Sequence, residues 1–274
     1  MRVGSRESPP SVSSDDDGSV RIDGDIPLGA LSSHHDIRER FAVLALACDC
    51  SGLRAASDLA TLAGDLTERS HCPYFCRNAA CHKTGGVTCP ARDGDNESLA
   101  ILEGGPCWSV HPSEVAVALV ALDATIEVDG PHGARSVAAA DFFILPAERM
   151  DREIALGYDE RIVGVRLPAA ASGGLQRFTK RVHLASSVDA YVSLAMTRRT
   201  DGEVRLVLGG VSPRPYRVYG SVEEEATSGG LDDDTIAGLA DRALLDAEPL
   251  SANGYKLEWA GLLLRDAIRE IDAG

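Results

Sequence analysis

Cysteine is the residue type in this chain with the clearest capacity for chemistry. Five of the seven cysteines lie in one short stretch: Cys72, Cys76, Cys81, Cys89 and Cys107. Glycine and proline lie among them and predict irregular backbone, which can turn several sulfur atoms toward one point. Thiolates grouped in this way suit an iron-sulfur cluster or a structural zinc ion. Their spacing therefore predicts a metal site and leaves both metals open.

The start of the chain indicates the redox environment of these thiols. The first residues lack the apolar stretch of an export signal, and no segment has the roughly 20 apolar residues of a membrane span. We therefore expect a cytoplasmic protein with no membrane span. In that compartment, closely spaced cysteines are more often metal ligands or redox groups than disulfides. Cys48 and Cys50 lie on an apolar stretch and are interpreted as small buried side chains.

Composition and charge narrow the class of protein. The chain has 274 residues, 44% of them hydrophobic and 25% charged, and its formal net charge is -15. This composition is typical of a globular chain with one large domain or two ordinary ones. Nucleic-acid binding depends on Lys and Arg that neutralise phosphates, and the sequence has no basic stripe, so no nucleic-acid partner is expected. The acidic runs at 223–225 and 232–234 are interpreted as a solvated loop, with a subunit contact as the alternative.

The distribution of apolar residues divides the chain into regions. Residues 1–24 are rich in Ser, Pro, Asp and Gly and are predicted to be disordered. Residues 25–169 form a first unit, in which the cysteine-rich insertion (about 70–108) is a loop. A linker of small residues then leads to a second unit at 174–274.

Hydrophobic periodicity predicts the elements of each unit. In the first unit, the runs ERFAVLALACDC and SEVAVALVALDA are predicted to be helices. The runs ATIEVDG and RSVAAADFF are predicted to form the two strands of a β-hairpin, and RIVGVRLP is predicted to be a further strand. The second unit begins with an antiparallel meander and finishes with two helices, the first capped by Asp234. The expected fold class is α+β.

Histidine does not predict a second metal site. Five histidines were weighed as ligands: His34, His35, His71, His82 and His111. No pair of them has the spacing of metal ligands on a predicted helix, so these five are interpreted as surface or capping residues.

Several sequence blocks, in their order along the chain, resemble a known family. The runs are ATLAGDL, HPSEVAVALVALDATIEVDGPHGARSV, DFFILP, FTKR, RLVLGGVSPRPYR and NGYKLEWAGLLLRDAI. Together they resemble the FAD-binding medium subunit of molybdenum hydroxylases, the xanthine dehydrogenase and aldehyde oxidoreductase family, over roughly residues 26–274. The resemblance implies an FAD-binding PCMH-type α/β subdomain followed by a flavoprotein C-terminal domain with an antiparallel three-stranded sheet and helices.

The function that the resemblance implies is electron transfer. In that family a molybdopterin-binding large subunit oxidises the substrate, a small subunit with two [2Fe-2S] centres relays electrons, and the FAD of the medium subunit passes them to an external acceptor. The chain would be an oxidoreductase subunit with both of these subunits as partners. No catalytic acid, base or nucleophile is expected, because the cofactors carry the redox chemistry.

The cysteine-rich insertion resembles an additional [4Fe-4S] site of one subgroup, which includes 4-hydroxybenzoyl-CoA reductases and bacterial aldehyde oxidoreductases. The resemblance lies in the block CPYF, the pattern CxKxGGxxC and a later cysteine. It implies Cys72, Cys81, Cys89 and Cys107 as the four ligands. Cys76 is the alternative to Cys72, because a loop lets either sulfur reach the iron, and a zinc site is the alternative to the cluster.

For the flavin, the resemblance implies contacts from a TIGGN-like turn, which here reads Thr61, Leu62, Ala63, Gly64 and Asp65. Alanine at 63 adds a methyl group where backbone approaches phosphate. The carboxylate at 65 lies beside an anionic group, where like charges repel. Both substitutions act against tight flavin binding.

Further flavin contacts are implied by a PSD-like block, with Ser113 and Glu114, and by Lys180 in FTKR, for which a solvated surface lysine is the alternative. Family members also have an AGGTD-like glycine loop, which forms the first half of the pyrophosphate cradle, and this sequence shows none. Three interpretations follow: a start assigned too late, a partner chain that completes the site, or a flavin-less, non-catalytic assembly subunit with a structural metal site.

Overall fold

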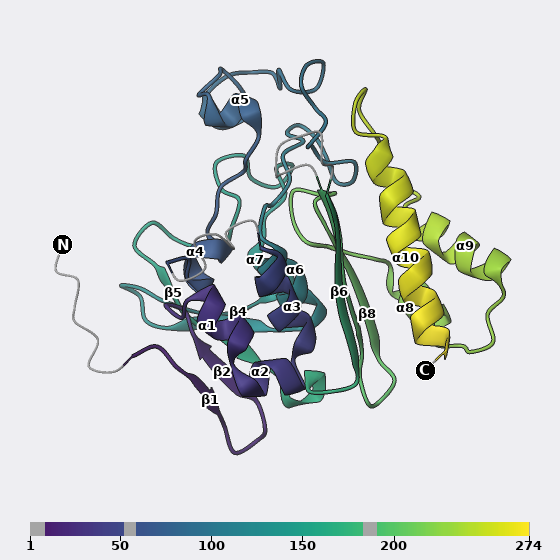
Figure 1. Cartoon of the computed structure of the whole chain (residues 1–274). Coiled ribbons are helices and arrows are strands. Elements are labelled where there is room, and N and C mark those ends of the chain that lie inside the picture. The colour runs from purple at the N-terminus through teal and green to yellow at the C-terminus, as the bar shows by residue number, and fades with distance from the viewer. Residues whose placement is uncertain (1–8, 52–58, 183–190, 274) are drawn as a thin grey trace.

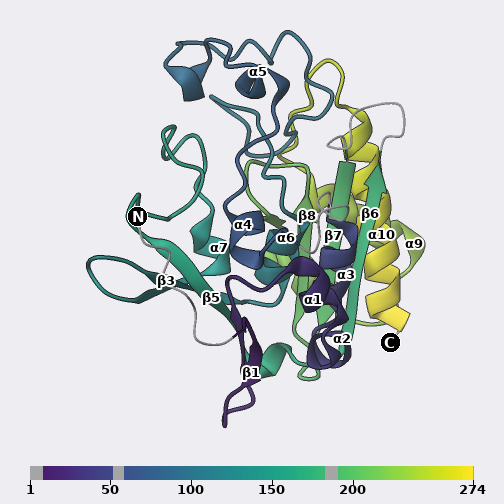
Figure 2. The same cartoon turned by 60° about the vertical axis from the view of Figure 1, so that its left-hand side comes forward.

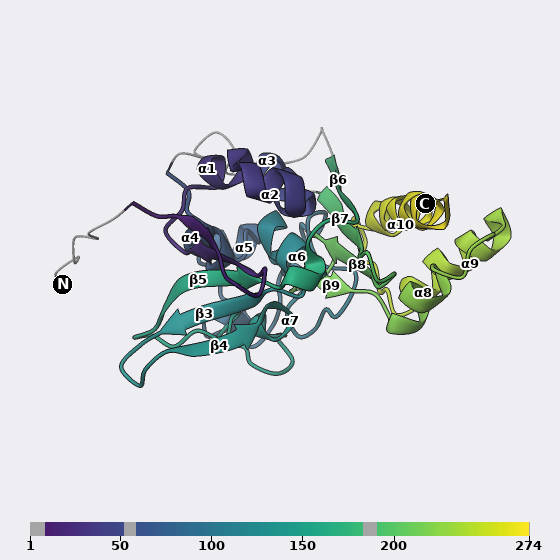
Figure 3. The same cartoon turned by 90° about the horizontal axis from the view of Figure 1, so that it is seen from below.

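The computed structural model describes residues 9–51, 59–182 and 191–273, and it contains two antiparallel β-sheets with helices between and beyond them (Figure 1). Seen from below, helix α6 (Glu114–Ala121) lies between the sheets, and α10 (Tyr255–Ala273) covers the far side of the second sheet (Figure 3). The fold is α+β, as the sequence predicts.

The first sheet has the strand order β1-β2-β5-β3-β4. Its strands are β1 (Val12–Ser14), β2 (Val20–Asp23), β3 (Thr125–Asp129), β4 (Arg135–Ala138) and β5 (Arg161–Leu167). Strands β3 and β4 form the predicted hairpin, with Ile126 opposite Val137. Ile126 and Val128 are fully buried while their neighbours along β3 are not, so one face of this strand covers the core.

The segment expected to be disordered contains a β-hairpin at residues 12–23. Val20 and Ile22 are fully buried, and β2 pairs with β5 along its whole length. The acidic run forms the turn, in which the Ser19 amide donates to Asp17 Oδ1 (2.9 Å). Burial of alternating apolar residues and strand pairing offset the entropy of ordering, so these residues are ordered, contrary to expectation. Residues 1–8 of that segment lie outside the described residues.

The second sheet contains the predicted meander and one short additional strand. Its strands, in spatial order, are β6 (Leu175–Val182), β7 (Tyr191–Arg198), β8 (Val204–Gly209) and β9 (Tyr216–Arg217). Residues 191–197 of β7 are all buried, because both faces of this sheet are covered. Leu194 packs into the core beneath the C-terminal helices, and Ala195 packs into the core of the first sheet.

Outside the cysteine-rich insertion, the other helices of the first unit are α1 (Leu28–Ser33), α2 (His35–Arg40), α3 (Ala42–Cys50), α4 (Leu62–Leu66) and α7 (Ala139–Phe142). Of these, α3, α4 and α7 pack against α6, whose residues are all buried. The helix predicted over ERFAVLALACDC is divided between α2 and α3 at Phe41. The backbone of Phe41 is not helical and its ring is fully buried, so the chain bends to place that ring in the core.

The C-terminal helices are α8 (Gly220–Glu225), α9 (Asp233–Ala243) and α10. Asp232, and not the predicted Asp234, caps α9 by accepting from the Thr235 amide (2.8 Å). Glu223, expected in a solvated loop, is buried in α8. There it pairs with Arg217 (2.7 Å) and accepts from the Leu206 amide (2.9 Å).

The cysteine-rich insertion projects beyond both sheets, toward the start of α10 (Figures 1 and 2). It contains only α5 (Pro73–Cys76) and the short 3-10 helix η2 (His82–Thr84) as regular structure. The 3-10 helix η3 (Ala169–Ala171) follows β5 at the predicted boundary, and the division into two domains there stays a prediction. Among the described residues, no helix is long and apolar enough to cross a membrane.

Candidate functional site

The turn from Thr61 to Asp65 begins helix α4 beside the first sheet. Thr61 caps the helix, because its Oγ1 accepts from the Gly64 amide (3.1 Å). The Leu62 and Ala63 amides donate to Ile26 O (3.0 Å) and Gly24 O (2.8 Å), and the Asp65 amide donates to Thr61 O (2.9 Å). These bonds join the turn to residues 24–26. The four amides therefore already have acceptors within the chain.

The Asp65 side chain lies inside the protein. It is 1% exposed, and its carboxyl group accepts hydrogen bonds from Ser113 Oγ and from Ser51 Oγ (3.4 Å). Burial raises the pKa of Asp65 to about 7, although the bonds from Ser113 and Ser51 act in the opposite direction. The charge that we expected beside an anionic group is therefore turned inward and partly neutralised.

Ser113 joins α4 to α6. Its Oγ donates to Asp65 and accepts from the Ala116 amide (2.9 Å), so Ser113 caps α6 as well. The two predicted blocks, which are far apart in the sequence, thus meet at one buried hydrogen bond.

Lys180 and Glu114 form a second buried contact of the predicted set. Lys180 Nζ bonds to Glu114 Oε1 and to Cys50 O (3.2 Å), and it lies 4.3 Å from the centre of the Tyr191 ring. The Lys180 side chain is 11% exposed and that of Glu114 is 3% exposed. The alternative interpretation of Lys180, a solvated surface lysine, is therefore wrong. The lysine belongs to β6 of the second sheet, and its side chain contacts α3 through Cys50 and α6 through Glu114.

His111 is buried, whereas the sequence led us to expect a surface or capping residue. Its Nδ1 accepts from the Ser113 amide (3.2 Å), and its ring meets the Phe143 ring edge-on at 4.5 Å. Nε2 is buried and has no hydrogen-bond partner among the described residues. Burial lowers the pKa of His111 to about 4, while Glu153 acts to raise it and His71 and Lys83 act to lower it. The ring is therefore neutral near pH 7.

The cysteines of the insertion differ in exposure. Cys81 and Cys107 are buried, Cys72 and Cys89 are half-buried, and Cys76 is exposed. The Cys76 thiol donates to Ser70 O (3.8 Å). The four sulfurs that the resemblance implies as ligands are thus the less exposed ones.

Three of these thiols lie near one another. Burial raises the pKa of Cys72, and the charges of Cys107 and Cys89 raise it further. The described residues nevertheless contain no group of three or more His, Cys, Asp or Glu arranged to hold a metal ion. The chemistry of the donor set suits a metal centre, but the thiols do not converge on one point.

Glu153 connects the insertion to the first unit, and sequence reasoning missed it. Its Oε1 accepts from Lys83 Nζ (2.7 Å) and Arg69 Nε (3.3 Å), and its Oε2 accepts from the Ser70 amide (3.1 Å). Burial alone would raise the pKa of Glu153, but the charges of Lys83 and Arg69 keep it below its usual value. No spacing in the sequence indicates this contact, because Glu153 lies far along the chain from the residues that it holds.

The return arm of the insertion, residues 96–102, is bound by the start of α10. Lys256 is fully buried and donates to Ser98 O (2.7 Å) and Gly210 O (2.6 Å). Asn253 donates to the carbonyls of Leu99 and Ala100, both at 3.1 Å. Burial lowers the pKa of Lys256 to about 7. Apart from the family resemblance, nothing in the run NGYK predicts these contacts with the return arm.

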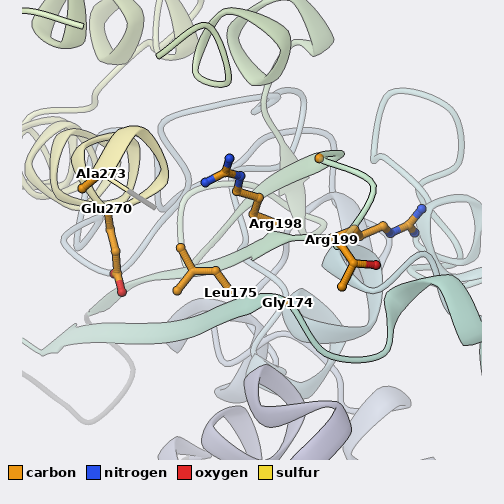
Figure 4. A pocket seen from close by; sticks show the side chains of 8 residues that line it. Gly174, Leu175, Arg198, Arg199, Glu270 and Ala273 are labelled. Atoms are coloured by element: carbon orange, nitrogen blue, oxygen red, sulfur yellow. The ribbon is translucent and has the colours of Figure 1, made fainter. Parts of the chain in front are cut away.

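A surface hollow lies away from all these residues, where the β7–β8 turn meets the end of α10 (Figure 4). It is lined by Gly174, Leu175, Arg198, Arg199, Glu270 and Ala273, among others. Arg198 is engaged there with the carbonyl of Ile271 (3.0 Å). None of the predicted site residues lines this hollow.

The chain is similar to several known proteins. Residues 11–170 match the family described as FAD binding domain in molybdopterin dehydrogenase. The chain is 34% identical over 262 residues to the aldehyde oxidoreductase FAD-binding subunit PaoB of Escherichia coli, covering 94% of this chain and 80% of PaoB. It is 27% identical over 177 residues to the glyceraldehyde dehydrogenase medium chain of Sulfolobus acidocaldarius, covering 61% of this chain and 60% of that protein.

Solved structures share the fold. Carbon monoxide dehydrogenase from Hydrogenophaga pseudoflava matches with a TM-score of 0.65 at 18% identity, over 96% of this chain and 78% of that one. Quinoline 2-oxidoreductase from Pseudomonas putida matches over the same shares with a TM-score of 0.63 at 15% identity. At such identities the likeness concerns the fold.

Proposed function

The chain belongs to the family of FAD-binding medium subunits of molybdopterin dehydrogenases, and from this premise we propose that it passes electrons from a molybdenum-containing large subunit to an external acceptor. The observation that carries the proposal is the similarity to PaoB, which extends over 94% of the chain. A small [2Fe-2S] subunit would complete the complex. The chain is thus an oxidoreductase subunit whose own residues bind, orient and insulate cofactors.

For FAD, we propose contacts from Thr61, Ala63, Gly64, Asp65, Ser113, Glu114 and Lys180. The support is that these residues lie around the ends of α4 and α6, joined by the contacts from Asp65 to Ser113 and from Lys180 to Glu114. Because the Asp65 carboxyl group faces Ser113, it does not present a full charge to phosphate. The amides of residues 62–65 already have acceptors, so further donors would have to come from elsewhere in the complex.

The test of flavin binding uses the chain purified with its partner subunits. Flavin absorbance and about one flavin released per chain on acid treatment are expected. An assembled complex that releases none would favour the alternative function, a flavin-less assembly subunit.

We also propose that Cys72, Cys81, Cys89 and Cys107 bind a [4Fe-4S] cluster. Such a cluster distributes its thiolate ligands over several iron atoms, so the sulfurs need not converge on one point as they would around a zinc ion. The partial burial of these four residues and the effect of Cys107 and Cys89 on the pKa of Cys72 support the set.

Iron and acid-labile sulfide test this assignment. Cys81→Ser and Cys89→Ser are each expected to lose most of both, and Cys76→Ser, the matched control, is expected to keep them. Unchanged iron in the first two variants, or loss in the control alone, would contradict the ligand set. Zinc in place of iron in the wild-type protein would favour the structural-zinc alternative.

A further inference from the structure

Helix α9 packs beside α10 on the far side of the second sheet (Figure 3), and a hollow of about 590 Å³ opens between the two helices. Its apolar lining comes from Leu244 at the end of α9 and from Leu257, Gly261 and Leu262 of α10. Leu257 is 38% exposed, and the neighbouring Leu245 is 77% exposed. The hollow is therefore an open groove with an apolar lining, which we call the α9–α10 groove.

Gly261 lines this groove in the middle of a long helix. Glycine destabilises the interior of a helix relative to alanine, so its presence there needs a reason. A β-carbon added at Gly261 would contact only Leu244 Cδ1, at 3.9 Å, among the described residues, and this is an ordinary van der Waals contact. Gly261 also lacks the positive φ that would require glycine. Packing within the chain thus leaves room for a side chain here, and glycine instead leaves that space to a group from outside.

The charged residues around the groove are mainly acidic. Residues 232–272 contain ten acidic residues and four basic ones, and one of the four, Lys256, is fully buried. The other three basic residues form ion pairs within the chain: Arg242 with Glu225, Arg265 with Asp241 and Arg269 with Asp233. Glu258 lines the groove and is exposed, and it has no ion pair within the described part of the chain. The groove therefore offers apolar surface together with negative charge that the chain does not balance.

This combination selects the kind of molecule that the groove fits. Glu258 and its acidic surroundings would repel nucleic acid and anionic lipid headgroups. A symmetric contact with a second copy of the chain would bring two acidic grooves together. A segment that carries a lysine or arginine beside apolar side chains is complementary both to the charge and to the apolar lining.

We propose that the α9–α10 groove receives an amphipathic helix from a partner subunit of the complex. Its apolar side chains fill the hollow against Gly261, and a lysine or arginine at its edge pairs with Glu258. Helices that lay an apolar face into a groove in this way are a common mode of recognition. The inference rests on the proposed function, which supplies the partner subunits.

Filling the groove tests this contact without removing an interaction that folds the chain. Gly261→Leu places a side chain in the hollow, and Gly261→Ala adds one methyl group. The matched control is Gly238→Ala in α9, where an added β-carbon meets nothing within 4 Å and which lies outside the lining of the groove. Each full-length variant is co-expressed with the large and small subunits. Dilution of the purified complex, followed by native mass spectrometry, gives its dissociation constant.

All three variants are expected to keep at least the wild-type unfolding free energy in denaturant, because each replaces a helical glycine. The dissociation constant should rise about tenfold or more in Gly261→Leu, rise less in Gly261→Ala and stay unchanged in Gly238→Ala. If Gly261→Leu does not fold, the comparison of the two alanine variants decides. A wild-type dissociation constant in both Gly261 variants, or an equal rise in Gly238→Ala, would overturn the inference.

A charge substitution tests the second part of the contact. Glu258→Gln should weaken assembly at low ionic strength and reduce its dependence on salt, whereas Asp266→Asn, on α10 but outside the groove, should do neither. Equal salt dependence in Glu258→Gln and wild type would overturn the pairing. If the wild-type chain assembles with neither subunit, the proposed function fails. If it assembles and the groove variants assemble equally well, only this inference fails.

Discussion

At the scale of single residues, Asp65 makes folding stability depend on pH. Burial raises its pKa from 3.8 to about 7 in the folded protein. Between these values the folded state keeps a proton that the unfolded state releases, so the free energy of unfolding falls as the pH rises from about 4 to about 7. Asp65→Asn should remove this slope and, at pH 8, exceed wild-type stability by up to about 4 kcal/mol.

Urea unfolding of the full chain at pH 5 and pH 8 measures this difference. The exposed Asp93→Asn is the control, and its pH dependence should match that of wild type. A slope retained in Asp65→Asn would show that another group titrates.

The contact between Lys180 and Glu114 gives a second prediction at this scale. Removal of one member of a buried ion pair leaves the other charge unpaired and typically costs about 3 to 5 kcal/mol. Lys180→Met should therefore be strongly destabilised, and the double variant Lys180→Met with Glu114→Gln should recover part of the loss. A double-mutant cycle by denaturant unfolding checks this. Additive effects would show that the two side chains are not coupled.

Single residues were predictable from sequence only where a family block names them. The blocks name Asp65, Ser113 and Lys180, but periodicity cannot show that Asp65 and Ser113 are directly bonded, since 48 positions separate them. The burial of His111 was not predicted, because the sequence does not distinguish a solvated histidine ring from a buried one. Its ring packs against Phe143, which is distant in sequence, so local pattern does not show the contact.

At the scale of elements, the start of α9 depends on one cap. Asp232→Ala removes the acceptor for the Thr235 amide and should cost about 1 kcal/mol of unfolding free energy. Asp234→Ala, its matched control in the first turn, should cost a few tenths of that or less. Thermal or urea unfolding measures the loss of unfolding free energy in both variants. Equal losses would mean that the negative charge at the helix start matters more than the capping hydrogen bond.

The cysteine-rich insertion gives another prediction at this scale. Glu153→Gln weakens the bonds to Lys83 and Arg69, and it leaves the buried charge of the Lys83 side chain poorly compensated. Amide hydrogen exchange over residues 69–84 should become faster, while exchange in β7 should stay unchanged. Glu148→Gln, at an exposed position nearby in the sequence, is the control. Unchanged exchange over 69–84 would show that the insertion is held by other contacts.

Elements with a clear hydrophobic period were predicted well. Helix α6 and the meander of β6, β7 and β8 lie where the sequence places them, and β3 and β4 form the predicted hairpin. The second strand of that hairpin is shorter than predicted, because β4 ends at Ala138 and residues 139–142 form α7. The N-terminal hairpin was missed because it has few apolar residues, and the burial of Val20 and Ile22 depends on pairing with β5. The break between α2 and α3 was missed because Phe41 fits a helical pattern equally well.

At the scale of the whole molecule, the second sheet connects two cores. One core contains α6 and the first sheet, and the other contains the C-terminal helices together with Ile101 and Leu102 of the return arm. The arm is therefore part of the C-terminal core, although it precedes that core by about a hundred residues in sequence. Sequence reasoning placed the arm in a loop of the first unit, because its packing partners were not visible from local pattern.

Substitution of Lys256 should therefore destabilise the return arm of the insertion as well as α10. Lys256→Met leaves the carbonyls of Ser98 and Gly210 without this donor, and we expect a loss of about 2 kcal/mol or more in unfolding free energy. Amide exchange over residues 98–102 should increase as well. The exposed Leu257→Met is the control. Exchange that increases only in α10 would contradict the connection.

The contacts of the return arm with residues 253–256 also set an order of events during protein synthesis. The ribosome makes the five clustered cysteines well before it makes Asn253 and Lys256, which fix the arm leading to Cys107. On a nascent chain, the surroundings of those thiols would stay incomplete until residues 253–256 had emerged and packed against the arm. Any metal that the thiols bind is therefore expected to be delivered after α10 has folded onto the arm.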